Sequence, residues 1–81
     1  MNRNEILAKV TAIFHDVFDD ESIEISDATT ASDIEDWDSL THITLINEIE
    51  DAFSYKFSMK EVLGMQNVGE MLDILVKHEG M

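Results

Sequence analysis

The 81-residue sequence contains no cysteine, no proline and only three glycines. A chain without cysteine forms no disulfide framework, no zinc–thiolate site and no thiol nucleophile of its own. Because proline and glycine are the usual interruptions of helical segments, their scarcity leaves the helical patterns unbroken. The sequence therefore predicts an all-α fold, a helix bundle around one small core.

Basic residues are also scarce. The chain has five Lys and Arg against 18 Asp and Glu, which gives a formal net charge of −13 at pH 7, and no basic residue lies between Lys9 and Lys56. Contacts with nucleic acids and with anionic membrane surfaces need lysine and arginine, so the composition argues against both partners. The charge favours basic protein partners, which long-range attraction steers toward the chain. Solubility alone is the other explanation.

Long apolar runs are missing as well. No stretch approaches the roughly 20 apolar residues that span a bilayer. The first residues, Met-Asn-Arg-Asn-Glu, are followed by no apolar signal segment. We therefore expect a cytoplasmic, monomeric protein with a single domain over residues 1–81.

Apolar residues at helical spacing indicate four helices. One is predicted up to about residue 18, one from 38 or 39 through 53, a short third over 59–63, and a last one after 67. Residues 19 to about 36 show no sustained period and are predicted to form a long loop between the first two helices. The expected core residues are Ile6, Val10, Ile13, Val17, Leu45, Ile46, Ile49, Phe53, Val62, Val68, Leu72 and Leu75.

Polar residues stand where helix caps are needed. Asn2 or Asn4 can cap the first helix, and Asp38 is a good N-cap for the second because its carboxylate can accept the free amide hydrogens of the first turn. Ser58 has a glutamate three residues later, which is the pattern of a capping box. Gly64 is expected to end the short third helix.

Ser39 is the strongest candidate for a functional residue. It lies in Asp36-Trp37-Asp38-Ser39-Leu40, at the end of the long loop and on the first turn of the second predicted helix. Carboxylates flank this hydroxyl, and no basic residue is near it in the sequence to activate it. The pattern indicates a serine that other enzymes modify, and therefore a carrier rather than a catalyst.

The whole chain resembles a stand-alone acyl carrier protein. The resemblance rests on Asp38-Ser39-Leu40 opening a helix that ends in Glu50-Asp51-Ala52-Phe53, followed by Asn67-Val68-Gly69-Glu70-Met71 at the start of the last helix. It implies a four-helix bundle with a short third helix. It also implies that a separate transferase esterifies Ser39 with 4′-phosphopantetheine from coenzyme A. The thiol of that arm then carries an acyl group, so that a cysteine-free protein does thiol chemistry.

In that family the second helix is the main surface met by phosphopantetheinyl transferase and by acyl-transferring or acyl-modifying enzymes with basic docking surfaces. Two positions depart from the common pattern, since Trp37 replaces a glycine before the triplet and Thr44 replaces a glutamate. Leu40 and Ile43 are read as an apolar patch for partners, with partial burial as the alternative. The residues expected to contact partners are Asp36, Asp38, Leu40, Ile43, Glu48, Glu50 and Asp51.

His42 and Trp37 each allow two interpretations. A nucleophilic pair of Ser39 and His42 would make a small hydrolase, but the sequence lacks a nucleophile elbow and an evident oxyanion hole. We therefore expect His42 to be a rim residue beside the arm, and no catalytic activity. Trp37 either anchors the loop on the core, which we favour, or contacts partners.

The acidic residues of the loop and the methionines of the second half of the chain have simple structural interpretations. The carboxylates of Asp33, Glu35, Asp36 and Asp38 lack the glycine and the final glutamate of an EF-hand loop, so no dedicated metal site is expected. The methionines are expected to fill the core. In the family, the space between the second and third helices can shelter an acyl chain, and methionine would suit such a space. The methionines in question are Met59, Met65 and Met71.

Two further functions compete with the acyl carrier. A peptidyl or aminoacyl carrier shares the serine motif, but such carriers are usually less acidic and embedded in larger chains. An acidic interaction module without a prosthetic group would explain the charge but not the position of Ser39. If the chain is an acyl carrier, the sequence does not distinguish between fatty acid, polyketide and sugar- or amino-modifying pathways.

Overall fold

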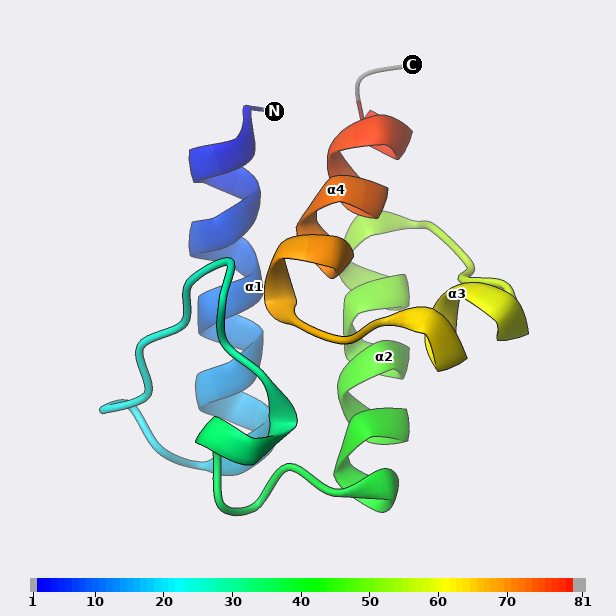
Figure 1. Ribbon diagram of the computed structural model, residues 1–81. Helices are drawn as coiled ribbons and strands as arrows, with labels where there is room; N and C mark the ends of the chain where they lie inside the picture. Colours follow the sequence, from blue (N-terminus) through cyan, green and yellow to red (C-terminus); the bar gives the residue numbers. More distant parts are fainter. Residues whose placement is uncertain (1, 80–81) are drawn as a thin grey trace.

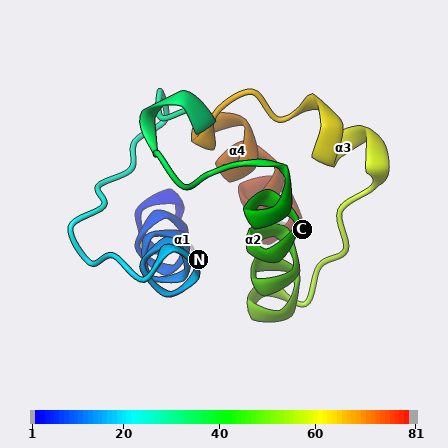
Figure 2. The same ribbon diagram turned by 90° about the horizontal axis from the view of Figure 1, so that it is seen from below.

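The computed structural model describes residues 2–79, and every regular element within that range is helical (Figure 1). The elements are α1 (Arg3–Phe18), the short 3-10 helix η1 (Ala31–Asp33), α2 (Ser39–Phe53), α3 (Met59–Gly64) and α4 (Val68–Glu79). Seen from below, α1, α2 and α4 are neighbouring columns and α3 is set to one side (Figure 2). The predicted all-α bundle with a short third helix and a long first loop is confirmed.

The predicted single domain over residues 1–81 stays a prediction. It includes Met1, Gly80 and Met81, which lie outside the described residues.

The core lies between α1, α2 and α4. Nine of the twelve residues expected there are buried, but Ile13, Val17 and Val62 are only partly buried. On α1 the buried residues follow each other at intervals of four, which leaves Ile13 and Val17 on the flanks of the stripe. Val62 belongs to α3, beside the bundle. The residues buried on α1 are Ile6, Val10, Phe14 and Phe18.

The helix caps follow the side chains that the sequence provides. Asn2, rather than Asn4, caps α1, and Asp38 caps α2. Ser58 and Glu61 form the expected capping box of α3, where the Ser58 amide donates to the Glu61 carboxylate over 2.9 Å. Gly64 is the last residue of α3, so the helix ends one residue later than predicted and is followed by an extended residue.

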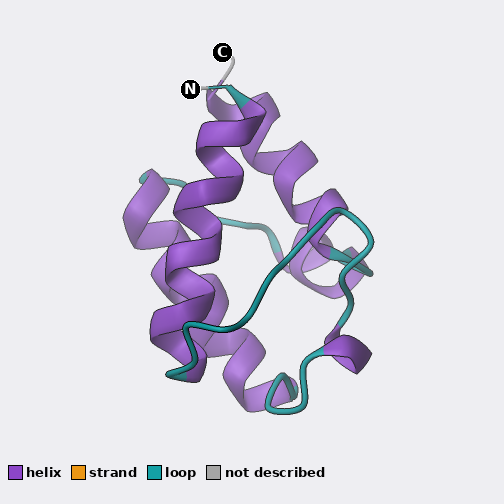
Figure 3. Cartoon of the chain, turned by 90° about the vertical axis from the view of Figure 1, so that its left-hand side faces the viewer, coloured by secondary structure: helices purple, strands orange, loops and turns teal. Residues whose placement is uncertain are grey.

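The long loop is tied to the start of α4. Figure 3 shows the loop crossing one side of the bundle from the end of α1. The amides of Val68 and Gly69 donate to the carbonyl oxygens of Thr29 and Asp27, each over 2.9 Å. These bonds satisfy two amides that a helix N-terminus leaves without an intrahelical partner. The approach is so close that a Cβ on Gly69 would lie 2.9 Å from the Asp27 carbonyl oxygen.

A single arginine connects the same region to α1. The Arg3 guanidinium donates to the Asp27 carboxylate over 2.9 Å and to the Asp73 carboxylate over 2.6 Å. Arg3 therefore joins α1, the loop and α4 in a chain where cations are few.

Candidate functional site

Ser39 is the first residue of α2 and is exposed. Within residues 2–79, no hydrogen bond engages its hydroxyl. The position follows from the local sequence, because Asp38 immediately before it caps the helix. The hydroxyl is therefore free to react with a group brought from outside.

Asp38 fixes the backbone on which Ser39 stands. Its Oδ1 accepts the amide hydrogens of Leu40 over 2.9 Å and Thr41 over 3.0 Å. The bond from the Thr41 amide is the largest cause that lowers the pKa of the Asp38 carboxyl, followed by the one from Leu40, and burial opposes them. The Thr41 hydroxyl accepts from the Asp38 amide and donates to the Asp36 carbonyl oxygen, over 2.7 and 2.8 Å. The start of α2 is therefore closed by its own residues.

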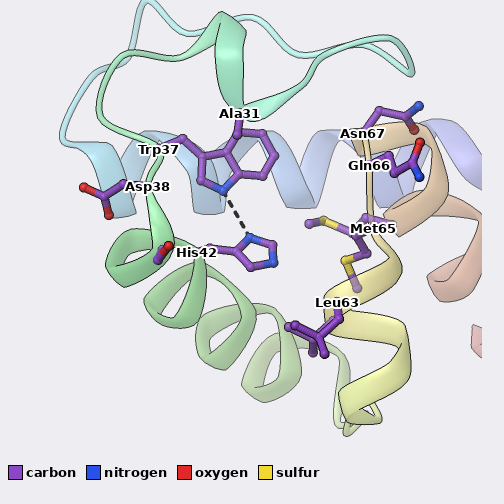
Figure 4. Close-up of a pocket in the computed structure, with 11 residues that line it drawn as sticks. Ala31, Trp37, Asp38, His42, Leu63, Met65, Gln66 and Asn67 are labelled. Atoms are coloured by element: carbon purple, nitrogen blue, oxygen red, sulfur yellow. Dashed lines mark hydrogen bonds between the residues drawn. The ribbon is translucent and has the colours of Figure 1, made fainter.

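A cleft of about 420 Å³ opens beside Ser39. It lies between the start of α2, the loop before it and the segment that connects α3 to α4. Figure 4 shows Trp37 and His42 on one side of the cleft, and Leu63 and Met65 on the other. The lining residues are Ala31, Trp37, Asp38, Ser39, His42, Val62, Leu63, Met65, Gln66, Asn67 and Met71.

Trp37 joins this cleft to the core. Its side chain is 9% exposed and packs edge-on against Phe14, with ring centroids 5.2 Å apart. Its indole Nε1 donates to Nδ1 of His42 over 3.1 Å. The expectation that Trp37 anchors the loop on the core is confirmed. The sequence did not reveal its bond to His42.

His42 is held in one tautomer by this bond. Since Nδ1 accepts from the indole, the ring proton of the neutral imidazole resides on Nε2. Across residues 2–79, no hydrogen bond joins His42 to Ser39. The arrangement lacks the base–nucleophile contact on which a serine hydrolase depends. His42 lies on the rim of the cleft, one helical turn beyond Ser39.

Exposed apolar side chains occur on both α2 and α3. Leu40 is 77% exposed and Ile43 is 59% exposed on α2, so the apolar patch predicted there is present. On α3, Met59 is 72% exposed and Leu63 is 78% exposed. The prediction that Met59 fills the core is therefore wrong, because α3 lies beside the bundle. The spacing of Met59 and Leu63, four residues apart, was the available signal for an apolar face.

The other two methionines differ from each other. Met71 is buried in the core, with 1% of its surface exposed, as expected. Met65 is partly buried and lines the cleft instead.

The predicted acidic contacts do not form one class. Glu50 is half-buried, whereas the other four carboxylates are exposed: Asp36, Asp38, Glu48 and Asp51. The Oε2 atom of Glu50 accepts the amide hydrogen of Phe57 over 2.7 Å. The Glu50 carboxylate therefore holds the connection between α2 and α3.

Across residues 2–79, no three histidine or acidic side chains are grouped so that they could hold a metal ion. None of the helices there has the length and apolar character needed to cross a membrane.

The chain resembles known proteins over nearly its whole length. Residues 8–75 match the family model described as a phosphopantetheine attachment site. An acyl carrier protein of Rubrobacter xylanophilus is 36% identical over 80 residues, which are 98% of each chain. The solution structure of a holo acyl carrier protein from Geobacter metallireducens is 40% identical, covers 91% of this chain and 85% of that one, and superposes with a TM-score of 0.86.

An exposed serine hydroxyl beside an open cleft fits a covalent arm, because the hydroxyl can be esterified without breaking an internal contact. These matches, together with the four-helix fold, show that the chain belongs to the acyl carrier protein family and carries a covalent 4′-phosphopantetheine.

Proposed function

We propose that Ser39 is the residue that bears the phosphopantetheine arm. The observation that carries this proposal is the free, exposed hydroxyl at the first position of α2. The matched family segment also includes this position. The holo protein would hold acyl intermediates as thioesters and present them to partner enzymes.

The capped start of α2 determines how the arm would be held. A phosphate at a helix N-terminus usually binds the free amides of the first turn. Here the amides of Leu40 and Thr41 donate to Asp38 instead. The carboxylate also repels a second anion. We therefore expect the phosphodiester to project into solvent, where a basic partner can bind it together with Asp36 and Asp38.

Intact mass spectrometry tests the attachment site. The protein is incubated with coenzyme A, magnesium and a broad-specificity phosphopantetheinyl transferase, and should gain the mass of one arm. Ser39→Ala should fold normally, because an exposed hydroxyl contributes little to stability, and should gain none. Ser32→Ala is the matched control, since Ser32 is an exposed serine in η1 and should load fully. Labelling of Ser39→Ala, or failure of the wild type with several competent transferases, would contradict the proposal.

We further propose that partner enzymes dock on the exposed face of α2. Support comes from the acidic side chains of Glu48 and Asp51, which are exposed, and from the apolar patch of Leu40 and Ile43. Basic partners would be steered by the charge and would bury the apolar side chains. Glu50 is the weakest member of the predicted set, because its carboxylate accepts from Phe57.

The docking face is tested with charge reversals at Glu48 and Asp51. Glu48→Lys and Asp51→Lys should slow the reaction with basic partner enzymes, and the loss should shrink at high salt because mobile ions screen exposed charges. Glu24→Lys changes the net charge equally at an exposed position of the first loop and should have a smaller effect. Equal effects of all three variants would show that only net charge matters.

The remaining parts of the proposal concern activity and place. We expect no catalytic activity, and the support is the engagement of the His42 Nδ1 by Trp37, because within residues 2–79 His42 makes no hydrogen bond to Ser39. We place the protein in the cytoplasm, where coenzyme A and a transferase can load it. The proposed pathway is fatty acid, polyketide or related biosynthesis.

A further inference from the structure

The lining of the cleft beside Ser39 combines apolar and polar side chains. Val62, Leu63, Met65 and Met71 are the apolar part of the lining, and the polar Gln66 and Asn67 lie beside Met65 (Figure 4). On the other side, the His42 ring points across the cleft toward Met65 (Figure 4). Ligand pockets are mostly apolar, and the few polar groups in them usually provide specificity. A cavity that sheltered only saturated chains would therefore be expected to lack polar groups.

Two side chains of the lining, one on each side of the cleft, offer hydrogen-bond donors (Figure 4). His42 Nδ1 is engaged by Trp37, so Nε2–H is the ring donor that remains, and residues 2–79 supply it with no acceptor. Asn67 lines the same cleft, and its Oδ1 accepts from the Glu70 amide, which leaves the amide NH₂ as a donor.

Trp37 gives the His42 donor a fixed direction. The indole is itself held by its edge-on contact with Phe14 in the core. An imidazole that is bonded through Nδ1 cannot turn freely, so its Nε2–H is presented to the cleft before any ligand arrives. Such preorganised donors favour a ligand with an acceptor at the matching place, because little rotational freedom is lost on binding.

We propose that this cleft selects acyl groups that bear a hydroxyl or carbonyl oxygen near the thioester, with His42 Nε2–H as the donor and Trp37 as the positioning residue. The inference rests on the proposed attachment at Ser39. A saturated chain would remove water from Nε2–H and leave the donor unpaired, whereas an oxygenated chain replaces that water. A carboxylate on the cargo is disfavoured, because Asp38 also lines the cleft.

The test compares two cargoes of equal length. The transferase loads the protein from hexanoyl- and 3-hydroxyhexanoyl-coenzyme A, and intact mass confirms loading. The rate of thioester cleavage by hydroxylamine is then divided by the rate for the same acyl group on N-acetylcysteamine, which removes intrinsic reactivity. The 3-hydroxyhexanoyl group should be protected about fivefold more than the hexanoyl group, as one net hydrogen bond implies.

Variants at His42 isolate the donor. His42→Leu removes it and should abolish the difference between the two cargoes. His42→Gln keeps an NH₂ donor at the far end of the side chain and should retain part of the preference. Trp37→Phe keeps an aromatic ring but frees the imidazole, so the preference should fall while both cargoes still load.

Nitrogen-15 NMR of the His42 ring supplies a readout that does not depend on reactivity. The Nε2 signal should move with the 3-hydroxyhexanoyl cargo and stay near its holo position with the hexanoyl cargo. An equal movement on forming the holo protein alone would mean that Nε2–H binds an amide of the arm, and would overturn the inference about cargo.

The failures of the two proposals are distinguishable. If the wild type gains no arm, the attachment at Ser39 fails. If every variant loads but the two cargoes are protected equally, or if His42→Leu keeps the preference, the carrier function stands and the selection of oxygenated cargo is refuted.

Discussion

The two described glycines should respond in opposite directions to the same substitution. Both lie in helices and neither has a positive φ, so alanine is compatible with the backbone at each. A Cβ at Gly64 meets nothing within 4 Å, whereas one at Gly69 meets the carbonyl oxygen and Cβ of Asp27 at 2.9 and 3.1 Å. Steric conflict at the loop–α4 contact is therefore the difference between the two sites.

The expected magnitudes follow from that contact. Alanine in place of glycine stabilises a helix by up to about 1 kcal/mol, and about half of that is expected at Gly64 because it ends α3. At Gly69 the start of α4 must move from the loop. This weakens the bonds of Val68 and Gly69 to the loop, each contributing about 1 kcal/mol, and adds about 1 kcal/mol of strain. Alanine's greater helix propensity offsets up to about 1 kcal/mol of this cost, so the net loss for Gly69→Ala is about 2 kcal/mol.

Thermal and urea unfolding measure this difference. For a domain of this size, Gly69→Ala should melt about 8–16 °C below the wild type, and Gly64→Ala about 2–4 °C above it. A Gly69→Ala variant as stable as Gly64→Ala would show that the loop and α4 separate at no cost, and would refute the idea that this close approach holds them together.

Three further predictions concern the cap, the core and the charge. The Asp38 carboxyl has a pKa below its ordinary value of 3.8, so its contribution to stability is present above that pH and is lost as the pH falls through the lowered pKa. The stability difference between wild type and Asp38→Ala in urea should therefore shrink from pH 7 to pH 3; an unchanged difference would contradict the ionised cap. Phe14→Ala should lower the free energy of unfolding by about 3–5 kcal/mol and Ile13→Ala by less than half as much, because only Phe14 is fully buried. Equal losses in urea titrations would contradict this burial. Salt or millimolar magnesium should raise the melting temperature, because the negative side chains behind the net charge of −13 repel one another in the folded state. A lowered melting temperature in calorimetry would show that repulsion does not limit stability.

Features set by neighbouring residues could be predicted from the sequence. The cap at Asp38 and the capping box of Ser58 involve residues two or three apart, so the sequence alone contains them. The exposed Leu40 and Ile43 followed from their place on the Ser39 side of α2. Local chemistry thus gave both the start of α2 and the position of its serine.

Features that depend on where α3 lies could not be predicted. The apolar Met59 looks like a core residue in the sequence, and only the placement of α3 beside the bundle exposes it. The carboxylate of Glu50 looks like a surface charge, and only the path of the chain after α2 brings the Phe57 amide to it. The bond between Trp37 and His42 joins the loop to α2, and helical periodicity carries no information about such a pair.

The contact between Trp37 and His42 also makes the wild-type protein its own optical reporter. Trp37 is the only tryptophan in the sequence, it lines the cleft beside Ser39, and its indole N–H is engaged by His42. Any group that enters the cleft changes the polarity around the indole. The emission of unlabelled protein can therefore follow loading and transfer in real time, without a dye that would itself occupy the docking face.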